Sequence, residues 1–166
     1  MATGLMITGS DIKKFTALNG NVDSDKYIQF LLIAQEIHAQ NYLGTDLYDK
    51  IQADIVASTL ASPYTTLVSD YIKQFLLHWA MVEYLPFAAY TIANKGVFKH
   101  SSENSESVEK NEVDYLVEKE RDIAEHYTQR LIDYLCNNNT LFPEYTTNSE
   151  GDMKPDHNTN FSGWVL

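Results

Sequence analysis

The feature that most constrains the fold is a strongly amphipathic stretch over residues 108–136. Its apolar side chains recur at near-heptad spacing, interrupted by Glu120, and comprise Val113, Leu116, Val117, Ile123, Tyr127, Leu131, Tyr134 and Leu135. Such a stripe predicts one long helix that buries one face against other helices. At 1.5 Å per residue this helix would span roughly 43 Å. The rest of the domain must therefore consist of elements that pack along a rod.

Earlier segments carry the same helical periodicity. Start and stop signals predict helices that begin near Thr8, Asp23, Thr45 and Pro63 and end before Asn19, Gly44, Ser58 and Gly96. Phe15, Leu18 and Ile37 should face inward, and Pro86 should kink the fourth helix or divide it in two. Because no alternating β-branched run occurs, we expect an all-α fold: about five helices in a compact bundle, with a long C-terminal helix and an extended tail.

The last quarter of the chain differs in composition from the rest. After three asparagines at 137–139, the chain is polar until it closes on Phe161-Ser162-Gly163-Trp164-Val165-Leu166. A polar segment buries too little apolar surface to offset its ordering entropy, so we expect it to stay in solution. The sequence thus predicts a helical domain over 1–137 and an extended tail over 138–166 for partner docking. The apolar end needs a groove, on its own chain or on a neighbour, which favours an assembly subunit.

Charge and cysteine content narrow the possible functions. The 166 residues carry a formal net charge of −11, which disfavours binding to nucleic acid or anionic membrane. Cys136 is the only cysteine, so no intrachain disulfide can form and a reducing compartment is the simpler interpretation. The most apolar stretch, 75–93, contains His78, Glu83 and Pro86, which argue against a membrane span.

No motif for catalysis or cofactor binding is present in the sequence. None of the five histidines has a glutamate three residues before it, and no zinc helix, phosphate loop or nucleophile elbow occurs. Asp122 and His126 could form half a metal site, but a surface pair is the simpler interpretation. His78 is predicted to be a hydrogen-bonded core residue, and Cys136 a small packing residue at a helix end. We expect no catalytic residue, metal or cofactor, and no enzyme activity.

Two segments carry a family resemblance. The first comprises Ile7-Thr8-Gly9-Ser10-Asp11-Ile12-Lys13-Lys14-Phe15 and "DKYIQFLLIAQEIHAQNYLGTDLYDKI" (residues 25–51). The second is "IKQFLLHWAMVEYLPFAAYTIANKGV" (residues 72–97), with a Ser/Glu/Asn-rich loop and a long charged helix after it. Together they resemble the head–tail connector, or adaptor, proteins of tailed bacteriophages, in particular those of crAss-like phages. The resemblance covers roughly residues 5–137 and includes no catalytic signature.

The resemblance implies a structural role in the virion. Such proteins form a homo-oligomeric ring, usually a dodecamer, between the portal protein and the next neck or tail ring protein. Genomic DNA passes through the lumen without specific binding, and no membrane is involved. The subunits would assemble in the host bacterial cytoplasm. The acidic charge is compatible with a lumen that repels phosphates, and equally with an ordinary acidic protein.

Candidate partner-binding residues lie in the tail and in the polar loop near residue 100. They are Phe142, Tyr145, Phe161, Trp164, Val165 and Leu166 in the tail and Lys95, Phe98, Lys99 and His100 in the loop. Two other functions stay open. One is an all-α module that binds a protein or a small ligand, with the aromatic residues of 71–92 lining a pocket. The other is a metal-dependent helical-bundle enzyme.

Overall fold

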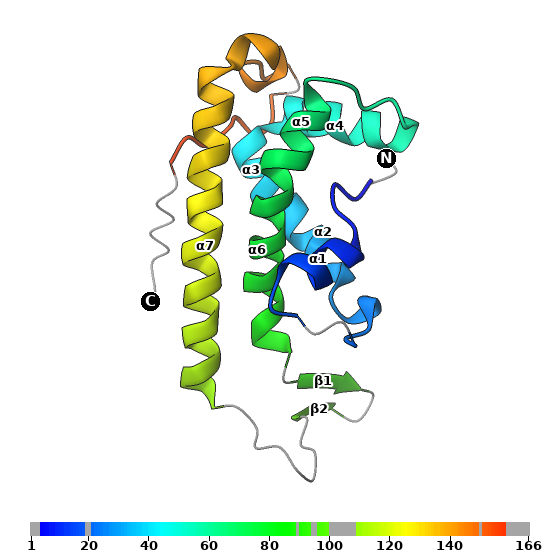
Figure 1. Ribbon diagram of the computed structural model, residues 1–166, viewed down its shortest axis with the longest axis vertical. Coiled ribbons are helices and arrows are strands. Elements are labelled where there is room, and N and C mark those ends of the chain that lie inside the picture. Colours follow the sequence, from blue (N-terminus) through cyan, green and yellow to red (C-terminus); the bar gives the residue numbers. More distant parts are fainter. Residues whose placement is uncertain are drawn as a thin grey trace.

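The computed structural model describes residues 4–18, 21–88, 90–93, 96–99, 109–149 and 151–158, with the backbone alone for Ser24, 91–93 and 96–99. Helix α6 (Lys73–Tyr84) lies at its centre. Helix α7 (Lys110–Asn137) runs along one side of α6, and α2 (Ile28–Ala34) packs on another (Figure 1). The predicted all-α class, with its long C-terminal helix, is confirmed.

Shorter elements complete the described part of the chain. In chain order they are α1 (Gly9–Phe15), a 3-10 turn (Ser24–Lys26), a π turn (Gln35–Ala39), α3 (Gln40–Leu43), α4 (Thr45–Ala57), α5 (Tyr64–Leu67), a second π turn (Val68–Ile72), a 3-10 turn (Leu85–Phe87), strands β1 (Tyr90–Ala93) and β2 (Gly96–Lys99), and 3-10 turns at Asn139–Leu141 and Pro143–Tyr145. Helices α2 and α3 are continuous through the first π turn, and α5 and α6 through the second.

Helix α1 begins as the sequence predicts but buries a different residue. Thr8 is the N-cap and forms a capping box with Asp11. Ile12 takes the inward position and is 1% exposed. Leu18 packs partly against the core, as expected. The inward prediction for Phe15 is wrong, because this side chain is 43% exposed and lies under the ammonium of Lys73 instead.

The π turn explains a second error, the inward prediction for Ile37, which is 56% exposed. A π turn has more residues per turn than an α-helix. It therefore keeps a four-residue spacing on one face, along which Leu31, Gln35, Ala39 and Leu43 are all buried. A uniform helix would have rotated this face away from the core.

Pro86 divides the fourth predicted helix, and the part after it is not helical. Helix α6 ends at Tyr84, and a 3-10 turn carries Pro86. The helix predicted up to Gly96 is wrong here, because β1 and β2 pair as an antiparallel hairpin in which Tyr90 faces Lys99. Tyr90, Thr91 and Ile92 favour strands, and periodicity alone does not separate a short apolar strand from a helix.

Helix α7 matches the prediction in length, but its two halves differ in burial. The buried residues are Ala124, Thr128, Leu131, Ile132 and Leu135. No residue of 110–123 is buried, and the predicted core residues Leu116 and Ile123 are 47% and 40% exposed. The small Ala124 and Thr128 let α6 approach closely, and Thr128 accepts a hydrogen bond from Trp79 Nε1 at 3.0 Å. The prediction missed this contact because neither residue belongs to a large apolar stripe.

The C-terminal segment lies on the helical body. The described residues after Tyr145 form neither helix nor strand, but Phe142 is 0% and Tyr145 3% exposed. The Phe142 ring packs edge-on against Tyr64 at 5.5 Å between ring centroids. The predicted solvation is therefore wrong for Phe142 and Tyr145, because these two rings anchor the described residues after α7 to the helical body. Residues 159–166 lie outside the described part.

Candidate functional site

Residues 139–158, here called the strap, cross the junction between α3 and α4. Two backbone hydrogen bonds hold the strap there: Thr45 N–H donates to Met153 O at 3.0 Å, and Asp156 N–H donates to Asn41 O at 2.9 Å. Gly44 lies in the chain between the acceptor, Asn41 O, and the donor, Thr45 N–H. Its φ is +75°. The strap therefore docks against a helix break rather than a helix face.

Position 44 requires a glycine for two separate reasons. Its positive φ with an extended ψ of 157° is a region that only glycine adopts readily. A Cβ atom at this position would also lie 2.7 Å from Pro155 Cδ, which is closer than side chains tolerate. The sequence predicted Gly44 as a helix stop, and this is confirmed, but its role as the seat of Pro155 had no sequence signal.

Thr45, near which α4 was predicted to begin, and the next residue, Asp46, both bind the strap. Thr45 Oγ1 donates to Asp152 Oδ2 at 3.0 Å and accepts from Met153 N–H at 3.2 Å. Asp46 Oδ2 accepts from Thr147 Oγ1 at 2.6 Å and from the Ser149 N–H and Oγ at 2.9 and 2.8 Å. No side-chain cap hydrogen bond is formed at the N-terminus of α4. Thr45 and Asp46, residue types that often cap helices, thus form hydrogen bonds with residues about a hundred positions later in the sequence.

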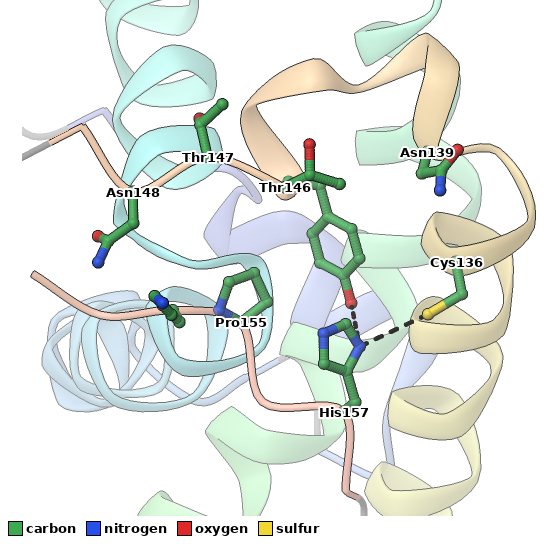
Figure 2. A pocket seen from close by; sticks show the side chains of 9 residues that line it. Cys136, Asn139, Thr146, Thr147, Asn148, Pro155 and His157 are labelled. Atoms are coloured by element: carbon green, nitrogen blue, oxygen red, sulfur yellow. Dashed lines mark hydrogen bonds between the residues drawn. The ribbon is translucent and has the colours of Figure 1, made fainter. Parts of the chain in front are cut away.

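A cavity of about 390 Å³ lies between the strap and the C-terminal end of α7 (Figure 2). It is lined by Cys136, Asn139, Tyr145, Thr146, Thr147, Asn148, Lys154, Pro155 and His157. His157 Nδ1 lies 3.5 Å from Cys136 Sγ and 3.3 Å from the Tyr145 hydroxyl. Burial, and next the neighbouring Cys136, raise the pKa of Tyr145 above its ordinary value. Cys136 is exposed, so the prediction that it is a packing residue is wrong.

Two histidine–glutamate pairs join α6 to the helices on either side. His38 Nε2 lies 2.9 Å from Glu83 Oε1, and the His38 ring stacks on Trp79 with 3.9 Å between ring centroids. His78 Nδ1 lies 2.7 Å from Glu120 Oε2. The prediction that His78 is a hydrogen-bonded core residue is confirmed, and Glu120, the polar interruption in the α7 stripe, is its partner.

Among the exposed apolar side chains, two groups lie by different helices. The α7 surface consists of Tyr115, Leu116 and Ile123, which are 58%, 47% and 40% exposed. The N-terminal surface consists of Leu5 and Val56, which are 37% and 50% exposed; Gly4, the residue before Leu5, packs against Ile55 and Val56 of α4. Helices α7 and α4 lie at opposite sides of the molecule (Figure 1). The domain therefore has two distinct places where a partner could bury apolar area.

The predicted partner-binding residues fare differently. Phe142 and Tyr145 are buried in their own domain, so contact with a partner would require them to leave the core. Phe98 and Lys99 lie on β2, far along the chain from the strap. The remaining candidates lie outside the described residues: Phe161, Trp164, Val165, Leu166, Lys95 and His100. None of the three residues of the α7 surface was predicted to meet a partner.

The described residues contain no group of three or more His, Cys, Asp or Glu side chains that could hold a metal ion. Asp122 is 70% exposed and lies 3.7 Å from Lys119, which agrees with its interpretation as a surface residue. In the same part of the chain, no helix has the length and apolar character needed to cross a membrane.

The fold thus defines a small helical domain whose C-terminal strap is docked at a helix break. Residues 39–154 match the model of DUF6712, a family of unknown function, and this match spans well over half of the chain. The chain therefore belongs to the DUF6712 family. The matched range includes most of the strap, in agreement with a single folded unit. No curated protein and no solved structure matches the chain.

Proposed function

We propose that this protein is a structural subunit of a phage head–tail connector ring below the portal, without catalytic activity. The observation that carries the proposal is the pair of exposed apolar groups on α7 and by α4, two helices that lie at opposite sides of the helical body (Figure 1). A ring forms by head-to-tail contacts, in which two different surfaces of each copy meet. The resemblance of residues 5–137 to connector proteins supports the same role.

In this arrangement the α7 surface of one copy packs on the N-terminal surface of the next. In the same proposal, the hairpin β1–β2 and the apolar residues Phe161 and 164–166 of the sequence contact the portal and the following ring. A ring lumen lined by part of the −11 charge would let DNA pass without gripping it. The virion is then the site of action, and the host cytoplasm the site of assembly.

The alternative of a binding module whose pocket is lined by residues 71–92 has less support. Phe75 and Trp79 are 0% and 4% exposed, and both fill the core rather than line the cavity by the strap. The enzyme alternative needs converging metal ligands, which the described residues do not supply. A structural role requires neither.

Assembly with the portal protein of the same virus tests the proposal. Purified protein, alone and with the portal, is imaged by negative stain and weighed by mass photometry. We expect rings with a central hole for the wild type and none for a Leu116→Glu, Ile123→Glu double variant, because charges on the α7 surface resist burial. Asn111→Glu, on an exposed part of the same helix, is the matched control and should assemble normally. A wild type that stays monomeric with the portal, or a double variant that forms rings, would contradict the proposal.

Removal of residues 159–166 tests the role of the C-terminal end separately. The cut leaves Phe142 and the described part of the strap in place, so circular dichroism should report an unchanged helical domain. Association with the portal or the next ring should weaken. Unchanged association would remove these eight residues from the proposed interface, while leaving the ring itself to be judged by the first experiment.

A further inference from the structure

We infer that the first π turn and α4 together form a binding site for an extended peptide, and that this site accepts residues 4–7 from a second copy as well as from its own chain. Residues 4–7, here called the N-terminal segment, lead from a contact with α4 to the start of α1 (Figure 1). The site has two buried amides that bind the backbone of the segment, two apolar anchors and one position that requires glycine. The inference does not depend on the proposed ring, because a single chain defines the site.

Two buried glutamines bind the backbone of the N-terminal segment. Gln35, the first residue of the first π turn, is 1% exposed. Its Oε1 accepts from Met6 N–H at 2.8 Å, and its Nε2 donates to Gly4 O at 3.0 Å. Gln52 of α4 is 6% exposed, and its Oε1 accepts from Gly4 N–H at 2.8 Å. Side-chain amides thus make the main-chain contacts that a neighbouring strand makes in peptide recognition by strand addition.

Side chains of the segment determine which sequences fit the site. Met6 and Ile7 are anchors, 7% and 3% exposed, whereas Leu5 is 37% exposed. A Cβ atom on Gly4 would lie 2.8 Å from Ile55 Cγ2, which is too close. Ile55 cannot easily rotate away, because a β-branched side chain in a helix has one strongly preferred rotamer. The site therefore selects a glycine, then any residue, then two apolar residues.

The contacts of the site favour exchange of the segment between copies. Without an occupant, the buried amides of Gln35 and Gln52 would lose their hydrogen bonds to the segment, which is costly. The same segment of a second copy restores every one of these contacts, and exchange of an identical element is a low-cost way to join protomers. The chain's own segment has only the advantage of a high effective concentration. The π turn that places Gln35 in the site is a feature often found at functional sites.

Peptide binding to full-length protein tests the inference. A fluorescent peptide of residues 1–8 represents the segment of a second copy, and its affinity is measured by anisotropy. In a full-length Gly4→Ala variant the chain's own segment clashes with Ile55 and competes poorly. We expect the peptide to bind this variant at least about tenfold more tightly than it binds the wild type, whose own segment competes. Equal affinities, or no binding to the variant, would overturn the inference.

Variant peptides test the selection of glycine. A Gly4→Ala peptide should lose most of its affinity for the Gly4→Ala protein, because its own Cβ meets Ile55. A Leu5→Ala peptide changes only an exposed side chain and should bind like the wild-type peptide. Equal binding of these two peptides would contradict a site that requires glycine.

A second protein variant weakens the chain's own segment without introducing a clash. Met6→Ala removes a buried anchor, so this protein should also bind the wild-type peptide more tightly than the wild-type protein does. Circular dichroism of both protein variants reports whether the helical body is intact. A folded Met6→Ala protein with wild-type affinity for the peptide would overturn the inference independently of Gly4→Ala.

Discussion

Gly44 combines a backbone requirement with a packing requirement. Gly151 also has a positive φ, +70°, but no atom lies within 4 Å of the place where its Cβ would be. The two glycines can therefore be compared directly: both have a positive φ, but only at Gly44 would a Cβ atom clash with another residue, Pro155. A comparison of the two isolates the contribution of the strap contact.

We expect Gly44→Ala to lower the free energy of unfolding by about 2–4 kcal/mol, since backbone strain and the clash with Pro155 add. Gly151→Ala should cost only about 1 kcal/mol, from the positive φ alone. Urea unfolding followed by circular dichroism measures both. Equal losses for the two variants would mean that Pro155 moves away without cost.

Asp11 connects the start of α1 to α6. Its carboxylate lies 2.6 Å from Lys73 Nζ and accepts the Thr8 N–H. Burial alone would raise the pKa of Asp11, but the hydrogen bonds from Lys73 and Thr8 outweigh burial and hold the pKa below its ordinary value of 3.8. A lowered pKa in the folded state stabilises the fold above the unfolded value, and this stability is lost as the pH falls through the folded value.

Asp11→Asn should therefore make the free energy of unfolding less dependent on pH below about pH 4, where the wild type loses the Asp11 contribution. At neutral pH the same variant should be less stable than the wild type. Asp25→Asn, at an exposed position, is the control and should follow the wild type throughout. Unfolding curves at several acidic pH values give the answer, and parallel curves for Asp11→Asn and wild type would count against the ion pair.

Among the elements, the strap depends on one ring more than on its many polar contacts. Phe142 is fully buried between Tyr64 and Tyr134, whereas its neighbour Leu141 is 48% exposed. Tyr64 also donates to Glu144 Oε2 at 2.7 Å, and burial, followed by this glutamate, raises the pKa of Tyr64 to about 12. The aromatic cluster therefore holds the beginning of the strap against the helical body.

Phe142→Ala should cost about 3–5 kcal/mol, the usual range for removing a buried ring. Leu141→Ala should change stability by less than about 0.5 kcal/mol, as expected for an exposed position. Thermal and urea unfolding of the two proteins provide the measurement. If the two alanine variants prove equally stable, the strap is not anchored through Phe142.

At the scale of the whole molecule, charge and apolar surface act in opposite directions. A formal net charge of −11 makes copies repel one another, while the α7 and N-terminal surfaces favour association. Screening by salt weakens the repulsion and leaves apolar contacts intact. The balance between oligomer and monomer should therefore respond to ionic strength.

Assembly should strengthen when the ionic strength rises from about 10 mM to about 150 mM, where the Debye length falls from about 30 Å to about 8 Å. Mass photometry or analytical ultracentrifugation across this range measures the shift. Weaker assembly in salt would indicate that the interface depends on ion pairs between copies rather than on apolar area.

Sequence periodicity and punctuation determined the helical class, the long α7, the helix start at Thr8, the break at Gly44 and the division at Pro86. These features depend on local backbone preferences and on residues a few positions apart, which one chain segment already contains. The same reasoning correctly predicted a hydrogen-bonded core His78, because an isolated polar residue in an apolar stretch needs a partner.

Only the tertiary structure decided which face of α7 is buried, that Thr45 and Asp46 hold the strap, and that Phe142 and Tyr145 belong to the core. It also brought His157 to Cys136, across 21 residues. Each of these depends on contacts between residues distant in sequence, where a small side chain or a positive φ admits a neighbour that local patterns do not encode. A polar segment with two aromatic rings has the composition of a free tail, and it docks because the body offers an aromatic cluster and a glycine break shaped to receive it.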